Sequence, residues 1–366
     1  MLAKTKNKVL SGKRLSKEDA IKLFETDDIF TLGKLASYAA RKKNGNKAYF
    51  IKNIHINPTN ICVNRCKFCA FSRSKGEEGA YEMTIDEIIH KLRAMSYELQ
   101  PPYSEVHIVG GLHPDWPFEY YLEMISRIKK YFPKICIKAF TATEIDYFSR
   151  ISGKGIVEIL TELKRHGLDT MPGGGAEIFD IGVRNQLCPE KLSGEGWLAV
   201  MKAAHKAGIK TNATMLYGHV ENYGQRVDHL LRLRELQDKT KGFQAFIPLA
   251  YHPKNNEIGG TYSSGIDDLK TIAVSRLVLD NFSHIKAYWI MLGEKLSQVA
   301  LLFGADDIDG TIIDEKVTHS AGALSSKGLT AGELINMIKK AGKVPVERDS
   351  FYRKLKVKSQ KRDVNE

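Results

Sequence analysis

The chain has 366 residues, of which 43% are hydrophobic and 27% charged, and its formal net charge is +12. No apolar run approaches the roughly 20 residues that cross a bilayer, and the lysine-rich start lacks the apolar core of a signal peptide. We therefore expect a cytoplasmic protein without a membrane partner. The lysines are scattered and no arginine–aromatic stripe occurs, which argues against a nucleic-acid partner, while the positive balance favours an anionic small substrate.

The predicted elements begin with two helices, one starting after the N-cap candidate Ser16 and one near residues 32–42. From residue 51 onward, short apolar segments alternate with helical patterns. The predicted strands are 51–56, 105–109, 135–140, 168–171, 210–216, 243–249, 285–290 and 308–313. The predicted helices are 85–99, 118–131, 144–166, 189–207, 225–238, 268–281 and 330–340, the last beginning with a capping box of Thr330 and Glu333.

This alternation predicts an α/β fold with seven or eight β/α units, a parallel (β/α) barrel of the TIM type. We expect one structural unit in three parts. Residues 1–48 form an N-terminal helical extension, residues 49–318 the barrel, and residues 319–366 a C-terminal cap with a basic tail. In such barrels the functional residues lie at the C-terminal ends of the strands, so the strand ends are the places to search.

The most informative motif is Cys62, Cys66 and Cys69, in the spacing C-x3-C-x2-C directly after the first predicted strand. Thiolates suit iron–sulfur clusters, Cu(I) and zinc, and three of them leave one iron of a 4Fe–4S cluster without a protein ligand. A structural zinc site wants four ligands, usually in paired Cys units, and Cys136 and Cys188 stand far away. An odd count of five cysteines argues against a disulfide framework.

Other candidates follow later strands. Gly110 and Gly111 allow a backbone to approach a ligand closely, whereas Glu144 is explained equally well as half of a capping box with Thr141. The glycines at 173–175 can cradle an anionic group beside Glu177. The last set comprises Arg184 for a carboxylate, the acid–base candidates His219, Glu221 and His252, and Cys188, to which we assign no role.

With Phe68 at the aromatic position, the cysteine motif resembles that of the radical S-adenosylmethionine (SAM) superfamily. The resemblance implies that Cys62, Cys66 and Cys69 hold a 4Fe–4S cluster whose open iron binds SAM, and that cleavage of SAM yields a 5′-deoxyadenosyl radical. Gly110 and Gly111 resemble the superfamily glycine motif that meets the amino group of SAM. We expect Phe68, Glu177 and Arg184 to lie around the cofactor as well.

Longer strings around the motif, chiefly residues 57–60, 71–73, 109–114, 171–179, 212–221 and 243–253, look like the menaquinone-biosynthesis branch, and in particular the aminofutalosine synthase family. That resemblance implies that the radical adds to the enol ether of 3-[(1-carboxyvinyl)oxy]benzoate and gives 6-amino-6-deoxyfutalosine, methionine and bicarbonate. It also implies a low-potential electron donor such as flavodoxin or ferredoxin. Two alternatives stay open: the related cyclic dehypoxanthinyl futalosine synthase, which abstracts hydrogen, and a non-catalytic metal-binding protein.

Overall fold

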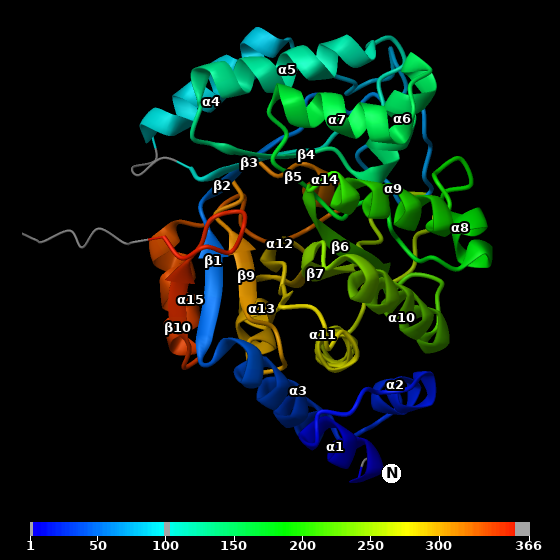
Figure 1. Ribbon diagram of the computed structural model, residues 1–366, viewed down its shortest axis with the longest axis vertical. Coiled ribbons are helices and arrows are strands. Elements are labelled where there is room, and N and C mark those ends of the chain that lie inside the picture. Colours follow the sequence, from blue (N-terminus) through cyan, green and yellow to red (C-terminus); the bar gives the residue numbers. More distant parts are fainter. Residues whose placement is uncertain (1–2, 99–102, 356–366) are drawn as a thin grey trace, which may run out of the picture.

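The structure, a computed structural model, describes residues 3–98 and 103–355, drawn as ribbon in Figure 1. The strands are β1 Lys47–Ile51, β2 Asn53–Ile56, β3 Glu105–Ile108, β4 Cys136–Ala139, β5 Thr170–Met171, β6 Lys210–Tyr217, β7 Phe243–Ala250, β8 His284–Ile285, β9 Asp307–Gly310 and β10 Val344–Glu347. The helices are α1 Ala3–Leu10, α2 Lys17–Phe24, α3 Ile29–Asn44, α4 Ile85–Glu98, α5 Phe118–Tyr131, α6 Ala142–Ser152, α7 Ile156–His166, α8 Ile181–Leu187, α9 Gly194–Lys206, α10 Tyr223–Thr240, α11 Gly265–Val278, α12 Trp289–Leu292, α13 Glu294–Ala300, α14 Val317–Ser320 and α15 Ala331–Lys340.

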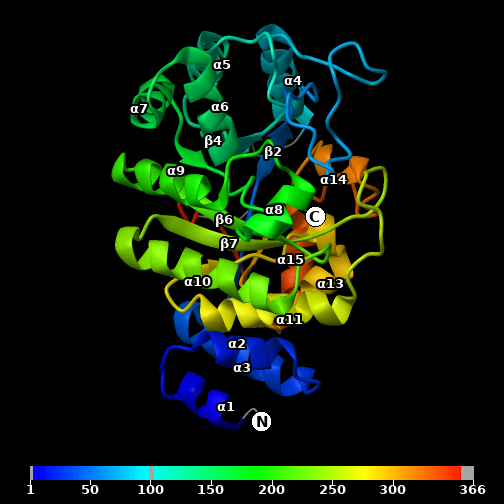
Figure 2. The same ribbon diagram turned by 90° about the vertical axis from the view of Figure 1, so that its right-hand side faces the viewer.

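Strands β2 to β8 form one parallel sheet in sequence order, and a second parallel sheet has the order β10-β1-β9. Two isolated bridges, Lys286 to Asp307 and Ile54 to Ile313, link the two sheets on either side. Helices α4 to α11 cover the outside, as the two views in Figures 1 and 2 show. This confirms the predicted α/β class and its parallel (β/α) barrel, in which the C-terminal ends of the strands gather at one end.

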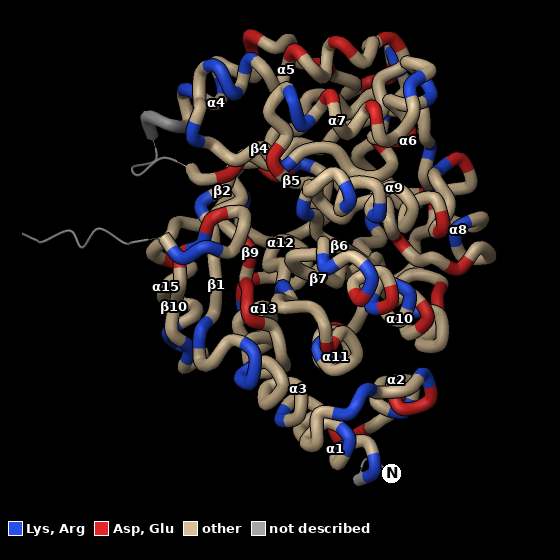
Figure 3. Tube along the Cα trace, in the orientation of Figure 1, with Lys and Arg blue, Asp and Glu red and all other residues tan. Residues whose placement is uncertain are grey.

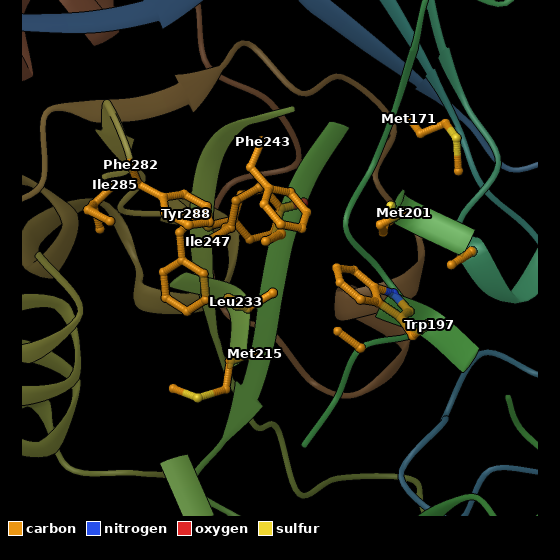
Figure 4. Close-up of a cluster of buried hydrophobic side chains, with 14 of the residues drawn as sticks. Met171, Trp197, Met201, Met215, Leu233, Phe243, Ile247, Phe282, Ile285 and Tyr288 are labelled. Carbon is orange, nitrogen blue, oxygen red and sulfur yellow. The ribbon is translucent and has the colours of Figure 1, made fainter. Parts of the chain in front are cut away.

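The outer helices are fixed by a buried aromatic layer, part of which Figure 4 shows. The rings of Trp197 and Phe243 are stacked with centroids 6.1 Å apart, and Phe243 stacks on Phe282 at 5.3 Å. Trp197 and Phe282 are completely buried and Phe243 nearly so. Burial of each such side chain contributes roughly 1.5–3 kcal/mol to stability, so this layer holds α9 firmly against β7.

The opposite, amino-terminal end of the barrel is filled with buried ion pairs. Lys138 Nζ lies 2.5 Å from Glu105 Oε2, and Arg348 Nε lies 2.6 Å from Asp307 Oδ2. Burial by itself would raise the pKa of Glu105, but Lys138 outweighs it and holds that pKa below its usual range. A third pair, Lys286 with Asp309 at 3.2 Å, completes what we call the base cluster: Glu105, Lys138, Lys286, Asp307, Asp309 and Arg348.

The structure corrects several element predictions. The helix expected at 144–166 is two helices, α6 and α7, because Gly153 takes a left-handed conformation (φ 70°) that caps the first. The strand expected at 285–290 ends at Ile285, and α12 begins at Trp289. Strands β1 and β10 and helices α1, α8, α12, α13 and α14 were not predicted. The capping boxes at Thr330 and at Thr141, and the N-cap at Ser16, are confirmed.

Of the three predicted parts, the N-terminal helices lie at one end of the molecule, with α3 packed along α11 (Figure 1). The C-terminal part does more than cover the barrel, because β10 pairs with β1 in parallel register, Tyr49 opposite Val346. The predicted basic tail lies outside the described residues from 356 onward, as does the end of the helix predicted at 85–99. Basic and acidic residues both spread over the outer helices (Figure 3), and none of the helices in the described ranges is long and apolar enough to cross a membrane.

Candidate active site

The cysteines lie on a long loop between β2 and α4 that is held by its own hydrogen bonds. The Thr59 hydroxyl donates to the Tyr81 carbonyl at 2.7 Å, and the Asn60 amide donates to the Gly79 carbonyl at 2.9 Å. The backbone N–H of Arg73 returns to the carbonyl of Asn60 at 2.8 Å. These contacts close the loop on itself, so its cysteine segment is positioned by backbone geometry.

A cavity of about 260 Å³ opens at the C-terminal ends of the strands, where the barrel rule places a site. Its walls come from the cysteine loop, from the turns after β3, β4, β5 and β7, from Leu216 near the end of β6, and from α12 and α14. The cavity lining includes Cys62, Asn64, Cys66, Phe68, Cys69, Phe71, Gly110, Gly111, Thr143, Glu144, Gly175, Glu177, Lys191, His252, Val317, Thr318 and Ala321. The three predicted cluster ligands are therefore brought to one space with Phe68, the glycine pair, Glu177 and His252.

The glycine pair is required by contact with the cysteine loop itself. A Cβ on Gly111 would stand 2.1 Å from the carbonyl oxygen of Ile61, and one on Gly110 would stand 3.0 Å from that of Thr59. Gly111 N–H also donates to the Thr59 carbonyl at 2.9 Å. The two glycines thus allow the start of the cysteine loop to pack against them. The sequence analysis had instead explained them by the close approach of a ligand.

Glu144 has both of the roles that the sequence left open. Its carboxylate accepts the backbone N–H of Thr141 at 2.6 Å, which completes the capping box, and it also lines the cavity. Burial raises the pKa of Glu144 to about 7, although hydrogen bonds from the backbone of Thr141 and Gly110 oppose the rise. A proton at this position is therefore exchanged near neutral pH.

Glu177 holds a largely buried lysine, Lys191, that the sequence analysis did not single out. Its Oε1 lies 2.7 Å from Lys191 Nζ, which in turn lies 5.0 Å from the ring centroid of Phe68. Burial lowers the pKa of Lys191, but the neighbouring Cys66 and Glu177 outweigh it and keep the ammonium charged. Within the described part of the cavity wall, Lys191 is the one permanently charged cation.

Arg184 is placed differently from the sequence interpretation. Its guanidinium donates to the carbonyl oxygens of Ala176 at 2.7 Å and Ile178 at 3.2 Å, and also contacts that of Leu192. It is 2% exposed and does not appear in the cavity wall. Since Nη1 and Nη2 donate to backbone carbonyls and Nε is buried without a partner, Arg184 braces the loop that carries Glu177 and is not positioned to grip a free carboxylate in bidentate fashion.

His219 and Glu221, at the end of β6, have their polar atoms hydrogen-bonded to one another and to neighbouring protein groups. The Glu221 carboxylate accepts from the backbone N–H of Gly218 at 2.6 Å and from Arg226 Nε at 2.7 Å, and it lies 2.9 Å from His219 Nδ1. His219 Nε2 donates to the carbonyl of Leu216 at 3.0 Å. Both side chains are fully buried outside the cavity wall, so the structure does not bring these two candidates to the cysteines.

His252, the third acid–base candidate, does line the cavity. Its Nε2 donates to the carbonyl oxygen of Met291 at 3.0 Å, while Nδ1 has no hydrogen-bond partner. Burial lowers the pKa of His252, so the neutral ring presents Nδ1 as an acceptor. Two more buried polar atoms of the cavity wall lack partners, Asn64 Nδ2 and Thr143 Oγ1. Such atoms are costly unless a bound molecule satisfies them.

A fourth cysteine lies beside the cluster loop. The thiols of Cys66 and Cys188 hydrogen-bond to one another, and the backbone N–H of Lys67 donates to the carbonyl of Leu187 at 2.8 Å. Across the described ranges, no three His, Cys, Asp or Glu side chains are already gathered around one point. The donor chemistry nevertheless fits an iron–sulfur cluster, because three thiols from one loop line the same cavity.

Comparison with known proteins gives matches over almost the whole chain. The profile of the Radical SAM superfamily matches residues 56–233, and that of the CofH/MqnC C-terminal region matches residues 240–361. The aminodeoxyfutalosine synthase of Thermus thermophilus is 47% identical over 96% of this chain and 95% of its own length. The protein of the same name from Streptomyces coelicolor is 44% identical over 94% and 92%.

A more distant relative, the 5-amino-6-(D-ribitylamino)uracil–L-tyrosine 4-hydroxyphenyl transferase of Methanococcoides burtonii, is 39% identical over 93% of this chain and 96% of its own. Among solved structures, methylornithine synthase superposes with a TM-score of 0.75 at 17% identity, covering 93% of this chain and 96% of its own. The hydrogenase maturase HydG of Carboxydothermus hydrogenoformans gives 0.73 at 16% identity, covering 96% and 80%. These two likenesses concern the fold alone.

Proposed function

Because the chain belongs to the radical SAM superfamily, we propose that it is an aminodeoxyfutalosine synthase. The observation that carries the proposal is the 47% identity to a protein of that name over 96% of this chain. In the reaction, the 5′-deoxyadenosyl group adds to the enol ether of 3-[(1-carboxyvinyl)oxy]benzoate. Rearrangement and loss of the carboxyl carbon, which takes up water to leave as bicarbonate, give 6-amino-6-deoxyfutalosine, and methionine is released.

The proposed cluster ligands are Cys62, Cys66 and Cys69, with SAM on the fourth iron. When bound, the iron–sulfur cluster and SAM together would supply the 5′-deoxyadenosyl radical. Asn64 Nδ2, Thr143 Oγ1 and His252 Nδ1 support a polar ligand in the same cavity, because all three are buried there without partners. We assign Phe68 and the glycine pair to the wall against which that ligand lies.

Lys191 is proposed to bind a carboxylate. The substrate has two carboxylates and SAM has one, and a charged ammonium with two N–H donors beyond its Glu177 contact suits such a group. Glu177 then orients Lys191 rather than contacting the cofactor alone. Its own backbone is held at φ 46°, a conformation that costs on the order of 1–3 kcal/mol for a residue other than glycine.

Proton transfer after the rearrangement is assigned to the cavity side chains that can exchange a proton. His252 offers a neutral acceptor nitrogen, and Glu144 has a pKa of about 7. The cavity wall is proposed to hold the alkene nearer to the radical carbon than any competing C–H bond. Positioning of this kind is worth roughly 7–11 kcal/mol of the barrier.

A low-potential electron donor such as flavodoxin or ferredoxin completes the proposal. A separate opening of about 320 Å³ is lined by Cys66 and Cys69 together with Arg65 and Lys67. The opening is also lined by Arg73, Glu77 and Glu257, and Arg65 pairs with Glu77 at 3.4 Å, so its cations outnumber its carboxylates by one. The exposed Lys67 would attract an acidic partner there. A cytoplasmic location, where the compartment is reducing, belongs to the same proposal.

The test is anaerobic incubation of the reconstituted protein with SAM, reductant and the enolpyruvyl benzoate, followed by mass analysis. The proposal expects the adenosyl mass to appear in the aromatic product. In a parallel incubation with dehypoxanthine futalosine in place of the benzoate, release of free 5′-deoxyadenosine would instead identify the cyclising relative. Absence of SAM turnover with stoichiometric zinc would leave a non-catalytic metal protein.

A further inference from the structure

A second, larger space adjoins the cavity. This open groove of about 1020 Å³ lies between the cysteine loop, α4 and the segment around α14. Figure 2 shows α14 beside the light-blue loop that carries the cysteines. Its lining includes Phe71, Arg73, Tyr81, Ile313, Lys316 and Lys327. Nothing in the proposed reaction has yet used it.

The groove and the cavity share one thin wall. Phe71 lines both spaces. On α14, Val317 and Thr318 line the cavity while His319 and Ser320 line the groove. This short helix is tied down by Glu315, whose carboxylate accepts the backbone N–H of Thr318 at 2.8 Å. A molecule in the groove is thus separated from the cavity by one aromatic ring and one helical turn.

Aromatic rings form one side of the groove. Phe71 and Tyr81 meet edge to face with centroids 6.2 Å apart, and Lys316 Nζ lies 4.7 Å from the centroid of the Tyr81 ring. Apolar atoms of Ile313 and Ala94 lie in the same lining. A surface of this kind receives a flat aromatic ring and places an ammonium at its edge.

The groove is lined by more basic than acidic side chains, and two of the basic ones are paired. Lys91 is paired with Asp314, and His319 with Glu315 through Nδ1 at 3.0 Å. Because His319 Nε2 also faces the carbonyl of Ser325, both ring nitrogens meet acceptors, as in a protonated histidine.

Three further cations, Arg73, Lys316 and Lys327, line the groove. Of the described carboxylates, none lies within ion-pair distance of Lys316 or Lys327, and Arg73 has only the partly exposed Glu77 at 3.7 Å. The uncompensated charge of the groove is therefore positive, and two of its lysines are free to bind an anion.

We propose that the groove is a second ligand site, which takes the aromatic dicarboxylate substrate before it passes the wall formed by Phe71 and α14. The ring would lie on Phe71 and Tyr81, and Lys316 and Lys327 would meet the carboxylates. The inference rests on the proposed function for the identity of the ligand. Its own basis is the juxtaposition of an aromatic side, unpaired lysines and a wall shared with the cavity.

The first test is calorimetric titration of the protein with the enolpyruvyl benzoate, with SAM bound and the cluster oxidised so that no turnover occurs. We expect two sites, the weaker of which is lost in the double variant K316Q/K327Q. The matched control is K339Q/K340Q, which removes the same charge from exposed positions on α15 and should retain both sites. A single site in the wild type, or a second site that survives in K316Q/K327Q, would overturn the proposal.

The second test is kinetic. At low salt, K316Q/K327Q should lower kcat/KM about 5–20-fold, with the loss in KM, and should flatten its dependence on ionic strength, because steering by charge is screened by salt. If the wild type forms product but both double variants behave alike, the groove is not on the path of the substrate while the proposed function stands. If the wild type forms no adenosylated product, the function fails, and the titration still decides the groove.

Discussion

The two ends of the barrel differ in how far the protein itself satisfies their buried polar groups. At the amino-terminal end, the base cluster pairs each of its charges within the protein, as in the 2.5 Å pair of Lys138 and Glu105, and Arg348 Nη2 is the one side-chain atom of that cluster without a partner. At the carboxyl-terminal end, Asn64, Thr143 and His252 each leave a buried polar atom without a partner. Burying an unmatched polar atom costs free energy, so the difference separates the end that maintains the fold from the end that a ligand completes.

Replacement of a cluster ligand should give the largest effect, and at the open end only. Cys66→Ala removes one of three thiolates, so we expect loss of iron and sulfide and no measurable SAM cleavage. Iron analysis, absorbance and assay of methionine release measure this. Cys136→Ala, at the start of β4 and away from the cavity, is the control and should retain all three. Full SAM cleavage by Cys66→Ala would remove the cysteine loop from the mechanism.

Breaking an ion pair of the base cluster should instead reduce the stability of the fold. Lys138→Met leaves the Glu105 carboxylate buried without its partner, and we expect a loss of about 3–5 kcal/mol in the free energy of unfolding. Urea unfolding measures this, and the affinity of the remaining folded protein for SAM should be unchanged. The double variant E105L/K138M removes both charges and should recover most of the loss. A SAM affinity that falls in parallel would show that the two ends are coupled.

Glu144 should make stability depend on pH. Its folded pKa of about 7 lies above the ordinary 4.5, so its contribution is complete below pH 4.5 and is lost as the pH rises through 7. A shift of this size corresponds to roughly 3 kcal/mol. The free energy of unfolding, measured between pH 5 and 8, should therefore decline in the wild type and be flatter in Glu144→Gln. Equal slopes in the two proteins would contradict the assignment.

Lys191 should matter for affinity. Lys191→Met removes the one permanent cation of the described cavity wall, and we expect about 10- to 100-fold weaker binding of SAM or of the benzoate, equivalent to roughly 1.4–2.8 kcal/mol. Separate titrations with the oxidised protein identify which carboxylate is held. Lys191→Arg keeps the charge and should recover part of the affinity. Unchanged affinities for both molecules would leave Lys191 as a partner of Glu177 alone.

Arg184 should give the smallest effect. Lysine cannot reproduce its fork of donors to the carbonyls of Ala176 and Ile178, so Arg184→Lys should lower stability by about 1–2 kcal/mol. The affinities for SAM and substrate should change little if the loop keeps its shape. A loss of affinity larger than that of Lys191→Met would restore Arg184 to the ligand site.

Features set by local sequence were predicted well. The helix at Phe118–Tyr131 and the capping boxes at Thr141 and Thr330 follow from periodicity and neighbouring residues. The position of the cysteine loop after a barrel strand followed from the alternation of elements. These predictions needed no knowledge of which distant segments meet.

What failed depended on distant partners. Lys191 faces the cavity because the segment between α8 and α9 folds back over Phe68, and no motif in the sequence indicates that. Arg184 donates to backbone carbonyl oxygens, and such contacts cannot be recognised from the side chains in the sequence. His219 and Glu221 are closed off by Arg226, which comes from the following helix α10. The strand β10 also could not be predicted from its own residues, because its partner β1 lies almost 300 residues earlier in the chain.

The pairing of β10 with β1 has a consequence for how the protein is made. The first strand of the barrel must wait for a neighbour encoded nearly at the other end of the described chain, Lys47 against Val344. At ordinary ribosomal rates that interval is on the order of 15–60 s. Until then the edge of β1 and the partners of Arg348 are exposed to chaperones and to aggregation. Completion of the barrel, and with it a rigid base beneath the cluster loop, accordingly depends on a contact of large sequence separation, which is slow to form.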